Sequence, residues 1–511
     1  MQKTVSGESL DSIVILGGGT AGWMAAALLS KALTGQATRI TVVESEEIGI
    51  VGVGEATVPT IHAFNRMLGL PQAEFMQRCQ ATIKLGIAFV DWGALGQRYM
   101  HGFSPYGAGP SVGHFPRLWL KHAHLAWARG EAPNIDDYNI SCVAGYAGRF
   151  AIPQPGAPTD VAMNYAYHFD AALYGQYLRD YAQARGVARI EGRVVEAAQN
   201  AETGFIEHLV LQSGETVAGD FFIDCSGFGG RLIEATLKTG YEPWGHWLPC
   251  DRAIAVPSRT EGAGLPYTRS TAVEAGWMWR IPLQHRAGNG YVYASSHIDD
   301  DAAEARLMAQ LDAPALAAPR RLRFVTGKRK QVWNRNCLAL GLAAGFLEPL
   351  ESTSIHLIQT SLFRLLTLFP DKNFDPAEIA EFNRQTDEEY ENVRDFLIAH
   401  YKVGRRDDTA FWRQCRDMEV PDRVARIIEL FAAKGRLSMR PEHLFGTESW
   451  LAVLLGQGGL PQDYDPLLRP MPEAQLTAQM TQVRAALLAM AARMPDHETF
   501  LRSEAGHAVT S

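Results

Sequence analysis

The chain has 511 residues, of which 47% are hydrophobic and 20% charged, a balance typical of a globular protein. Its formal net charge of −8 provides neither the basic surface of a nucleic-acid-binding protein nor a polybasic membrane patch. The six cysteines form no CxxC pair and no His/Cys cluster with metal-ligand spacing, which favours buried thiols in a reducing compartment and no metal site. Acidic residues precede the apolar stretch 13–29, and no apolar run has transmembrane length, so we expect a cytoplasmic protein.

A pattern typical of a nucleotide-binding βα unit lies near the N-terminus. The apolar run 12–16 predicts a parallel strand covered on both faces, and the Ala/Leu-rich segment 23–33 predicts a helix. Between them, Gly17, Gly19 and Gly22 have the spacing GxGxxG. Glycines at this spacing let backbone N–H groups and a helix N-terminus approach a pyrophosphate.

A second predicted strand, 39–43, ends in the acidic residue Glu44. Its carboxylate is placed to accept hydrogen bonds from an adenosine ribose. A GxGxxG alone is weak evidence, because glycine turns occur in many βα units. The order of strand, glycines, helix, strand and acid favours the dinucleotide interpretation over that alternative.

Two later segments favour FAD over NAD. Residues 220–227 form an apolar strand that ends in an acid and small residues, and 337–345 form another apolar segment. Strand–turn units that return to the nucleotide indicate a split, FAD-type domain around one elongated cofactor. No second GxGxxG is present to seat a nicotinamide nucleotide, so we expect the flavin to arrive already reduced.

Three further segments carry candidate functional residues. The glycine-rich turn 49–54 precedes Glu55 and allows close backbone approach to a ligand. Residues 78–92 read as one apolar strand with Lys84 in its middle. In GWMWRIP (276–282), two tryptophans on the same side of an extended stretch would form a wall, although filling a core is the alternative.

The organisation of the chain changes at about residue 370. Residues 1–370 are expected to form the split FAD-binding domain, with interleaved substrate-binding segments at about 95–220 and 245–330. Within them, 164–185 reads as an amphipathic helix. Residues 371–511 are expected to form a mainly helical lobe that completes the substrate pocket, with helical periodicity at 376–400, 421–434 and 473–493.

Taken together, these segments resemble the FAD-dependent tryptophan halogenase family over residues 12 to about 470. The resemblance implies a mixed α/β fold, with a Rossmann-like FAD-binding domain of the flavin aromatic hydroxylase type, a substrate-binding sheet and a helical C-terminal lobe. It also implies that a separate NAD(P)H flavin reductase supplies FADH2. The segments that carry it are GGGTAGW (17–23), GVGEATVP (52–59), Lys84, GWMWRIP (276–282) and FLEPLEST (346–353).

The resemblance assigns residues to the cofactor and the halide. In this family the tryptophans that match Trp277 and Trp279 shield the substrate from a flavin hydroperoxide. Only a halide then reaches the hydroperoxide, and hypohalous acid forms. Thr353 and Ser354 match positions whose backbone amides hold chloride or bromide, although well-studied members have glycine at the second. The cofactor-binding residues implied are Gly17, Gly19, Thr20, Ala21, Gly22, Glu44, Gly54, Glu55, Ala56, Leu342 and Leu347.

Lys84 and Glu351 match the family's two catalytic residues. A buried ammonium is costly unless it is paired or functional, and Lys84 would hydrogen-bond hypohalous acid or form a haloamine beside the substrate. The alternative is a surface lysine on an edge strand. Glu351 would stabilise the cationic intermediate and accept its proton. Glu348 is the rival carboxylate, and Glu351 is preferred because it directly precedes Ser352.

The substrate end of the sequence is less defined. His101 and Phe103 match the slab on which family members stack an indole, and Trp450 would flank the ring or pack in the core. Tryptophan-specific members grip the amino-acid moiety with tyrosines in a long insertion, whereas 445–455 is compact and has no paired tyrosines. A branch without the tryptophan-anchoring insertion, acting on indole or another electron-rich aromatic, is therefore expected.

Two other functions are compatible with parts of the sequence. An FAD-dependent aromatic monooxygenase would share the fold and cofactor, but Lys84 and WxWxIP argue against it. A flavin carrier or sensor without turnover is the second. The expected partners are an NAD(P)H flavin reductase, which supplies diffusible flavin without a stable complex, and a small aromatic substrate. No nucleic acid or membrane partner is expected, and both a monomer and a homodimer stay open.

Overall fold

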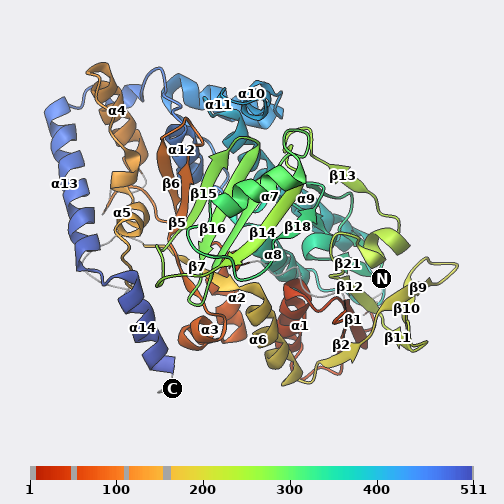
Figure 1. The fold of residues 1–511 in the computed structure, drawn as a ribbon. Helices are drawn as coiled ribbons and strands as arrows, with labels where there is room; N and C mark the ends of the chain where they lie inside the picture. Colours follow the sequence, from red (N-terminus) through yellow and green to blue (C-terminus); the bar gives the residue numbers. More distant parts are fainter. Residues whose placement is uncertain (1–6, 48–53, 109–113, 154–162, 509–511) are drawn as a thin grey trace, which may run out of the picture.

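The computed structural model describes residues 7–47, 54–108, 114–153 and 163–508, and its parallel nucleotide-type sheet lies beside a larger mixed sheet (Figure 1). The first sheet is parallel except for its edge strand β20, as expected for a sheet that is covered on both faces. In spatial order its six strands are β20 (Trp333–Asn334), β21 (Cys337–Ala339), β12 (Phe221–Asp224), β1 (Ser12–Leu16), β2 (Arg39–Glu44) and β8 (Ala188–Glu191).

Strand β1 forms the centre of this sheet. It pairs in parallel with β2 on one side and with β12 on the other, so segments about 200 residues apart in the chain lie side by side. Helix α1 (Thr20–Ala32) follows β1 and is buried along most of its length. The predicted strands at 12–16 and 39–43 are therefore confirmed, and the strand expected within 220–227 is β12. The helix starts three residues earlier than the segment from Trp23 indicated.

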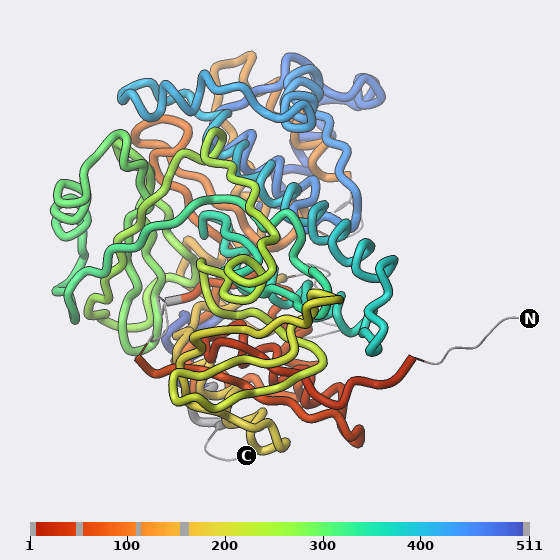
Figure 2. Tube along the Cα trace, turned by 90° about the vertical axis from the view of Figure 1, so that its right-hand side faces the viewer, coloured from red at the N-terminus to blue at the C-terminus, as the bar shows by residue number. Residues whose placement is uncertain are grey.

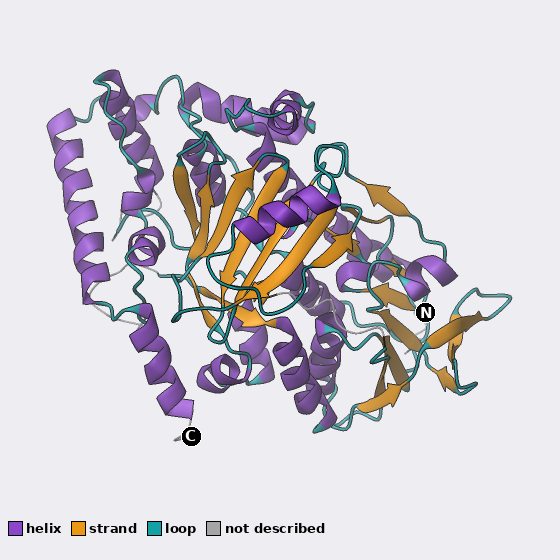
Figure 3. Cartoon of the chain, in the orientation of Figure 1, coloured by secondary structure: helices purple, strands orange, loops and turns teal. Residues whose placement is uncertain are grey.

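The second sheet carries the tryptophan motif. Strand β16 is the predicted stretch GWMWRIP, and it is buried on both faces except at Arg280. Helix α7 (Asp300–Ala309) covers part of the sheet (Figure 3). The spatial order of its seven strands is β18 (Arg320–Arg323), β14 (Arg252–Ser258), β17 (Ala287–Tyr293), β16 (Gly276–Pro282), β15 (Thr268–Val273), β5 (Gly86–Val90) and β6 (Arg98–Gly102).

The segment 78–92, predicted as one strand, consists of two strands in different sheets. Strand β4 (Thr82–Lys84) pairs with β7, whereas β5 belongs to the seven-stranded sheet. The chain changes sheets at Leu85, whose N–H donates to the carbonyl of Pro266. Lys84 is thus the last residue of a short strand at the junction of two sheets.

The segment 164–185, predicted as a helix, is also divided. Strand β7 (Ala166–Asp170) lies between β3 (Gly54–Ala56) and β4, and only then does helix α6 (Ala171–Gln183) begin. Every β7 residue is buried. The Asp170 carboxylate accepts from the backbone N–H groups of Ala172 and Leu173, which fixes the start of the helix. The prediction failed because the pairing partners of β7 are distant in the sequence.

Two small sheets extend the fold. Strands β9 (Val194–Gln199), β10 (Ile206–Leu211) and β11 (Thr216–Ala218) form an antiparallel meander. The other sheet contains β13 (Tyr241–Pro243), β19 (Gly327–Arg329) and β22 (Gly345–Phe346).

Helices make up most of the chain after residue 370, as predicted. Figure 2 shows the C-terminal part of the chain (blue) above and beside the N-terminal part (red). None of the helices in the described ranges is long and apolar enough to cross a bilayer. The remaining α-helices are α2 (Ile61–Leu68), α3 (Gln72–Arg78), α4 (Phe115–Ala128), α5 (Ile140–Tyr146), α8 (Ser354–Thr367), α9 (Pro376–Lys402), α10 (Ala410–Asp417), α11 (Asp422–Lys434), α12 (Thr447–Gly456), α13 (Glu473–Arg493) and α14 (His497–Ala508).

Candidate active site

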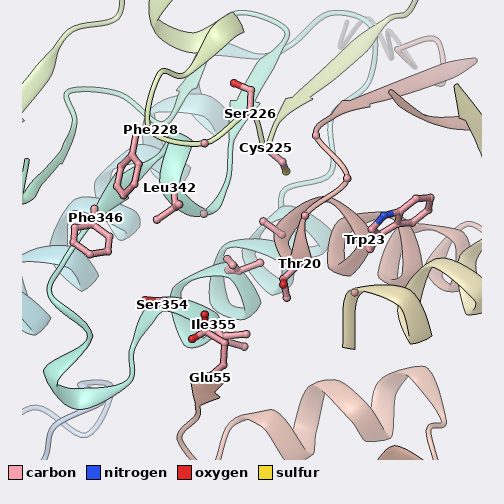
Figure 4. Close-up of a pocket in the computed structure, with 18 of the residues that line it drawn as sticks. Thr20, Trp23, Glu55, Cys225, Ser226, Phe228, Leu342, Phe346, Ser354 and Ile355 are labelled. Atoms are coloured by element: carbon pink, nitrogen blue, oxygen red, sulfur yellow. The ribbon is translucent and has the colours of Figure 1, made fainter. Parts of the chain in front are cut away.

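A single cavity of about 1290 Å³ runs from the parallel sheet to the tryptophan motif. In Figure 4, Thr20 and Trp23 lie on α1, with Glu55, Ser354 and Ile355 along one side of the cavity and Phe228 and Phe346 on another. The candidate residues that line this cavity are Gly17, Gly19, Thr20, Ala21, Glu44, Glu55, Ala56, Trp277, Trp279, Leu342, Leu347, Thr353 and Ser354.

The glycines shape the nucleotide end of this cavity. Gly17 has φ +114°, and a Cβ there would lie 2.3 Å from the carbonyl oxygen of Cys225. A Cβ on Gly22 would lie 1.8 Å from the carbonyl oxygen of Gly17, so Gly22 permits the turn without lining the cavity. Gly19 caps α1 without a side-chain hydrogen bond, and the space around its Cα is open. The free N–H groups of the helix start therefore suit a pyrophosphate.

Glu44 lies directly over the glycine turn. A Cβ on Gly18 would lie 1.3 Å from the Glu44 carboxylate, and the indole N–H of Trp23 donates to that carboxylate at 3.4 Å. Arg189, on the neighbouring strand β8, donates to its other oxygen. A carboxylate has about four lone-pair sites, so Glu44 keeps acceptor capacity for ribose hydroxyls. These features fit the adenosine half of FAD.

Replacing Gly19 with alanine is expected to lower FAD affinity about tenfold, which corresponds to ~1.4 kcal/mol. The variant should fold normally, because no atom lies within 4 Å of the added Cβ. The new methyl group would nevertheless obstruct close approach of the pyrophosphate. Flavin fluorescence titration measures the affinity. Gly245→Ala is the matched control, since its Cβ also meets nothing within 4 Å and Gly245 does not line the cavity. Equal affinities for the two variants would contradict the assignment.

The two tryptophans form one wall of the cavity. Both rings are buried, and their centroids lie 6.1 Å apart. Gly290 makes room for Trp279, because a Cβ there would lie 2.0 Å from the indole Cη2. The Trp277 indole N–H donates to Glu348 at 3.1 Å, and the hydroxyl of Tyr401 donates to the same carboxylate oxygen. Glu348 therefore ties the wall to helix α9.

Buried Glu348 differs from Glu351 in its electrostatics. Burial raises the pKa of Glu348 to about 7, and the hydrogen bonds from Tyr401 and Trp277 only partly oppose this. Its second oxygen makes no hydrogen bond within the described part of the chain. Glu348 thus holds Trp277 in place, which is consistent with the preference for Glu351 as the reacting carboxylate.

The turn 351–354 separates the cavity from a second, buried site. Ser352 has φ +60°, a left-handed conformation that an L side chain adopts at a cost of about 1 kcal/mol. Helix α8 begins at Ser354, and its cap Thr353 makes no side-chain capping bond. The Thr353 hydroxyl is buried and finds no partner among the described residues. Free backbone N–H groups at this helix start suit an anion such as a halide.

Lys84 lies on the far side of this turn from the cavity. Its side chain is fully buried, and Nζ donates to the hydroxyl of Ser352 at 2.7 Å and to the carbonyl of Thr57 at 3.0 Å. Burial lowers the pKa of Lys84 to about 7, against the opposing effect of Glu351. The structure therefore excludes a surface lysine on an edge strand. Nζ also lies 5.2 Å from the centroid of the Phe103 ring.

Glu351 is held between two histidines. Its Oε2 lies 2.9 Å from Nδ1 of His101, and its Oε1 lies 2.8 Å from Nε2 of His400. Burial would raise the pKa of Glu351, but the two histidines outweigh burial and hold the pKa at about 2. The carboxylate is therefore charged at neutral pH, and its charge acts on Lys84.

An aromatic cluster adjoins this carboxylate. His101 and Phe103 lie with ring centroids 6.5 Å apart, and Phe445 stacks on Phe396 at 4.1 Å. Trp450 packs edge-on against Phe396 at 5.3 Å and is buried. His101 thus contacts Glu351 as well as the aromatic rings.

Some residues lie outside the cavity, and others that line it were not predicted. Lys84, His101, Phe103, Glu351 and Trp450 belong to the buried site or its aromatic surroundings. Gly54 is in β3, and the rest of the predicted turn 49–54 lies outside the described residues. The unpredicted residues include Arg189, Ser226, Phe228, Ser270 and Phe346 of the cavity, and His400 and Tyr401 beside the carboxylates. Among the described residues, no group of three or more His, Cys, Asp and Glu is arranged to hold a metal.

The glycine cradle, the long cavity and the fold define a flavin-dependent oxidoreductase. The family model for tryptophan halogenase matches residues 12–473, and the chain belongs to this family. It is a flavin-dependent halogenase of aromatic substrates. Tryptophan 6-halogenase SttH of Streptomyces toxytricini is 35% identical over 504 residues, covering 93% of this chain and 94% of that protein.

Two solved structures resemble this one over nearly the whole chain. Xcc4156, a flavin-dependent halogenase from Xanthomonas campestris, has a TM-score of 0.92 and 47% identity, covering 97% of this chain and 99% of that chain. BrvH, a flavin-dependent halogenase from Brevundimonas sp. BAL3, has a TM-score of 0.92 and 45% identity with the same coverages. The predicted fold class and enzyme class are thus confirmed.

Proposed function

We propose that this halogenase uses FADH2, O2 and chloride or bromide to generate hypohalous acid, which reaches Lys84 and halogenates a small electron-rich aromatic such as indole. The observation that carries the proposal is the turn 351–354. Ser352, Thr353 and Ser354 line the flavin cavity, while the Ser352 hydroxyl contacts Lys84 and Glu351 faces the aromatic cluster. One turn thus joins a site for the oxidant to a site for the substrate.

Each side chain has a distinct part in this proposal. Bound reduced flavin with O2 supplies the oxidising equivalents for converting halide to hypohalous acid. The wall of Trp277 and Trp279 keeps the aromatic substrate out of the cavity, and the backbone N–H groups of Thr353 and Ser354 hold the halide. Lys84 receives the electrophilic halogen, as a hydrogen-bonded acid or a haloamine. Glu351 stabilises the cationic ring and accepts its proton.

The substrate preference is inferred from the side chains around the buried site. The rings of His101, Phe103, Phe396 and Phe445 offer aromatic contacts, and Trp450 packs behind Phe396. The compact segment 445–455 supports a branch without the tryptophan-anchoring insertion. An amino-acid zwitterion needs partners for both charges, and the phenylalanine and tryptophan rings of this cluster offer none, so indole is preferred.

The test is a reaction of FAD, NADH and a separate flavin reductase with indole, in chloride, in bromide and without halide, followed by mass spectrometry. We expect a halogenated product only with halide, and none when the reductase is omitted, because reduced flavin arrives from outside. A hydroxylated product that forms without halide would identify an aromatic monooxygenase instead. Flavin binding without any product across a wider aromatic screen would favour a carrier or sensor.

A further inference from the structure

His400 has a protonation pattern that its hydrogen bonds determine. Its imidazole is buried, with Nδ1 lying 2.8 Å from the carbonyl oxygen of Phe396 and Nε2 lying 2.8 Å from Oε1 of Glu351. A carbonyl only accepts hydrogen bonds, so Nδ1 carries a hydrogen. Nε2 then either donates from an imidazolium to a carboxylate or accepts from a carboxylic acid. In both cases one dissociable proton lies between His400 and Glu351.

The surroundings favour the imidazolium form. Nδ1 of His101 also lies 2.9 Å from Oε2 of Glu351, and a hydrogen bond from this nitrogen stabilises the carboxylate. The rings of Phe89, Trp92 and Phe396 surround His400, with centroids 4.8–6.0 Å from the imidazole. Because the pKa of Glu351 is held at about 2, its carboxylate is ionised, so the hydrogen bond between them comes from Nε2–H of His400 and the pair carries no net charge.

Lys84 is affected by the charge of this pair. A carboxylate without a neighbouring cation would favour the ammonium form of Lys84, whereas a neutral pair leaves burial to favour the amine. The other titratable groups facing this site are Tyr99 and His168. Burial raises the pKa of Tyr99 and lowers that of His168, so both are neutral near pH 7. His101 is the remaining ionisable neighbour of Glu351.

We propose that His400 is a positioning residue that neutralises Glu351 and thereby keeps Lys84 available as an uncharged amine. The proposal rests on the function given above, in which Lys84 receives the halogen. An amine reacts with hypohalous acid by forming an N–halogen bond. The N–H and O–halogen bonds break, and the proton joins the hydroxide to leave as water. An ammonium has no lone pair for this step.

The direct test is a titration of Lys84 by NMR of [13Cε]-lysine-labelled protein, with Lys84→Arg identifying the resonance. We expect a midpoint near 7 in the native protein and a rise of about 1–3 units in His400→Gln, which keeps an N–H donor but cannot carry charge. The rise should vanish in the Glu351→Gln background, because no carboxylate is left to neutralise. His297→Gln changes a half-buried histidine bonded to Gln414, and this control should not move the midpoint.

Several results would overturn the proposal. An unchanged midpoint in His400→Gln, or the same rise without Glu351, would show that His400 does not act through this carboxylate. 15N-histidine NMR of the native protein provides a test that needs no variant. We expect both nitrogens of His400 to be protonated at pH 7, and an unprotonated Nε2 would refute the assignment.

The pH profile of halogenation separates this role from a merely structural one. In His400→Gln, turnover at pH 7 should fall about fivefold if the midpoint rises from about 7 to about 8 and about fiftyfold if it rises to about 9, and it should recover as the pH increases, whereas misplacement of Glu351 would lower turnover at every pH. The NMR titration requires no product. Absence of halogenation in the native protein would therefore refute the proposed function, while the Lys84 midpoints would still decide the role of His400.

Discussion

Lys84→Ala is expected to abolish halogenation, lowering product formation by about 10²–10⁴-fold, while consumption of FADH2 and O2 continues. The reason is the position of Lys84 beyond the turn 351–354, where its Nζ contacts Ser352 but does not line the flavin cavity. Removing it should leave the flavin site intact and remove the group that, in the proposed function, delivers halogen to the substrate. Parallel measurement of halogenated product, oxygen uptake and released hydrogen peroxide tests this separation.

Two controls make the result specific to the amine. Lys31→Ala removes an exposed lysine from the last turn of α1 and should leave product formation unchanged. Lys84→Arg keeps a positive charge but has no amine to accept halogen, so it should be nearly as inactive as the alanine variant. Unchanged product yield in Lys84→Ala would remove this residue from the mechanism. Loss of oxygen uptake along with product would place it instead at the flavin.

The nucleotide end of the site could be predicted because its signals are local. The strand 12–16, the glycines and Glu44 lie within about 30 residues, and the physical demand for close backbone approach is visible in the spacing itself. The tryptophan motif could be predicted for the same reason, since alternation along one strand puts Trp277 and Trp279 on the same face. The long helices after residue 370 follow from their apolar periodicity.

The buried site depends on contacts that no local pattern encodes. Lys84 reaches Ser352 across 268 residues, and Glu351 meets His101 across 250. His400 lies on a helix whose apolar face reads as core, and nothing in its neighbourhood indicates a carboxylate partner. The strand β7 was missed because its sequence also fits helical spacing, and only pairing with β3 and β4 decides the outcome.

Indole is expected to be halogenated in preference to free tryptophan, mainly at C3. Both substrates present the same nucleophilic ring, but tryptophan must also desolvate an ammonium and a carboxylate. Without partners this costs several kcal/mol. The rings around Glu351 supply apolar contacts through Phe103 and Phe445, so they can hold a ring without fixing its orientation. A loosely held indole reacts at its intrinsically most nucleophilic carbon. Competition between the two substrates, with regiochemistry by NMR, measures both preferences.

Substrates that carry only one of the two charges show which one opposes binding. Tryptamine and indole-3-propionate each retain the ring but have C3 occupied, so 3-methylindole is their reference, and both should be converted less well than 3-methylindole if neither charge finds a partner. Glu448, half-buried in the first turn of α12, is a candidate for holding an ammonium. Preferential conversion of tryptophan at a single benzo-ring carbon, lost in Glu448→Gln, would show that α12 does clamp the amino-acid moiety. The opposite outcome is that both charged analogues lose conversion equally and that Glu448→Gln does not change these losses. This would show that the aromatic cluster selects the ring alone.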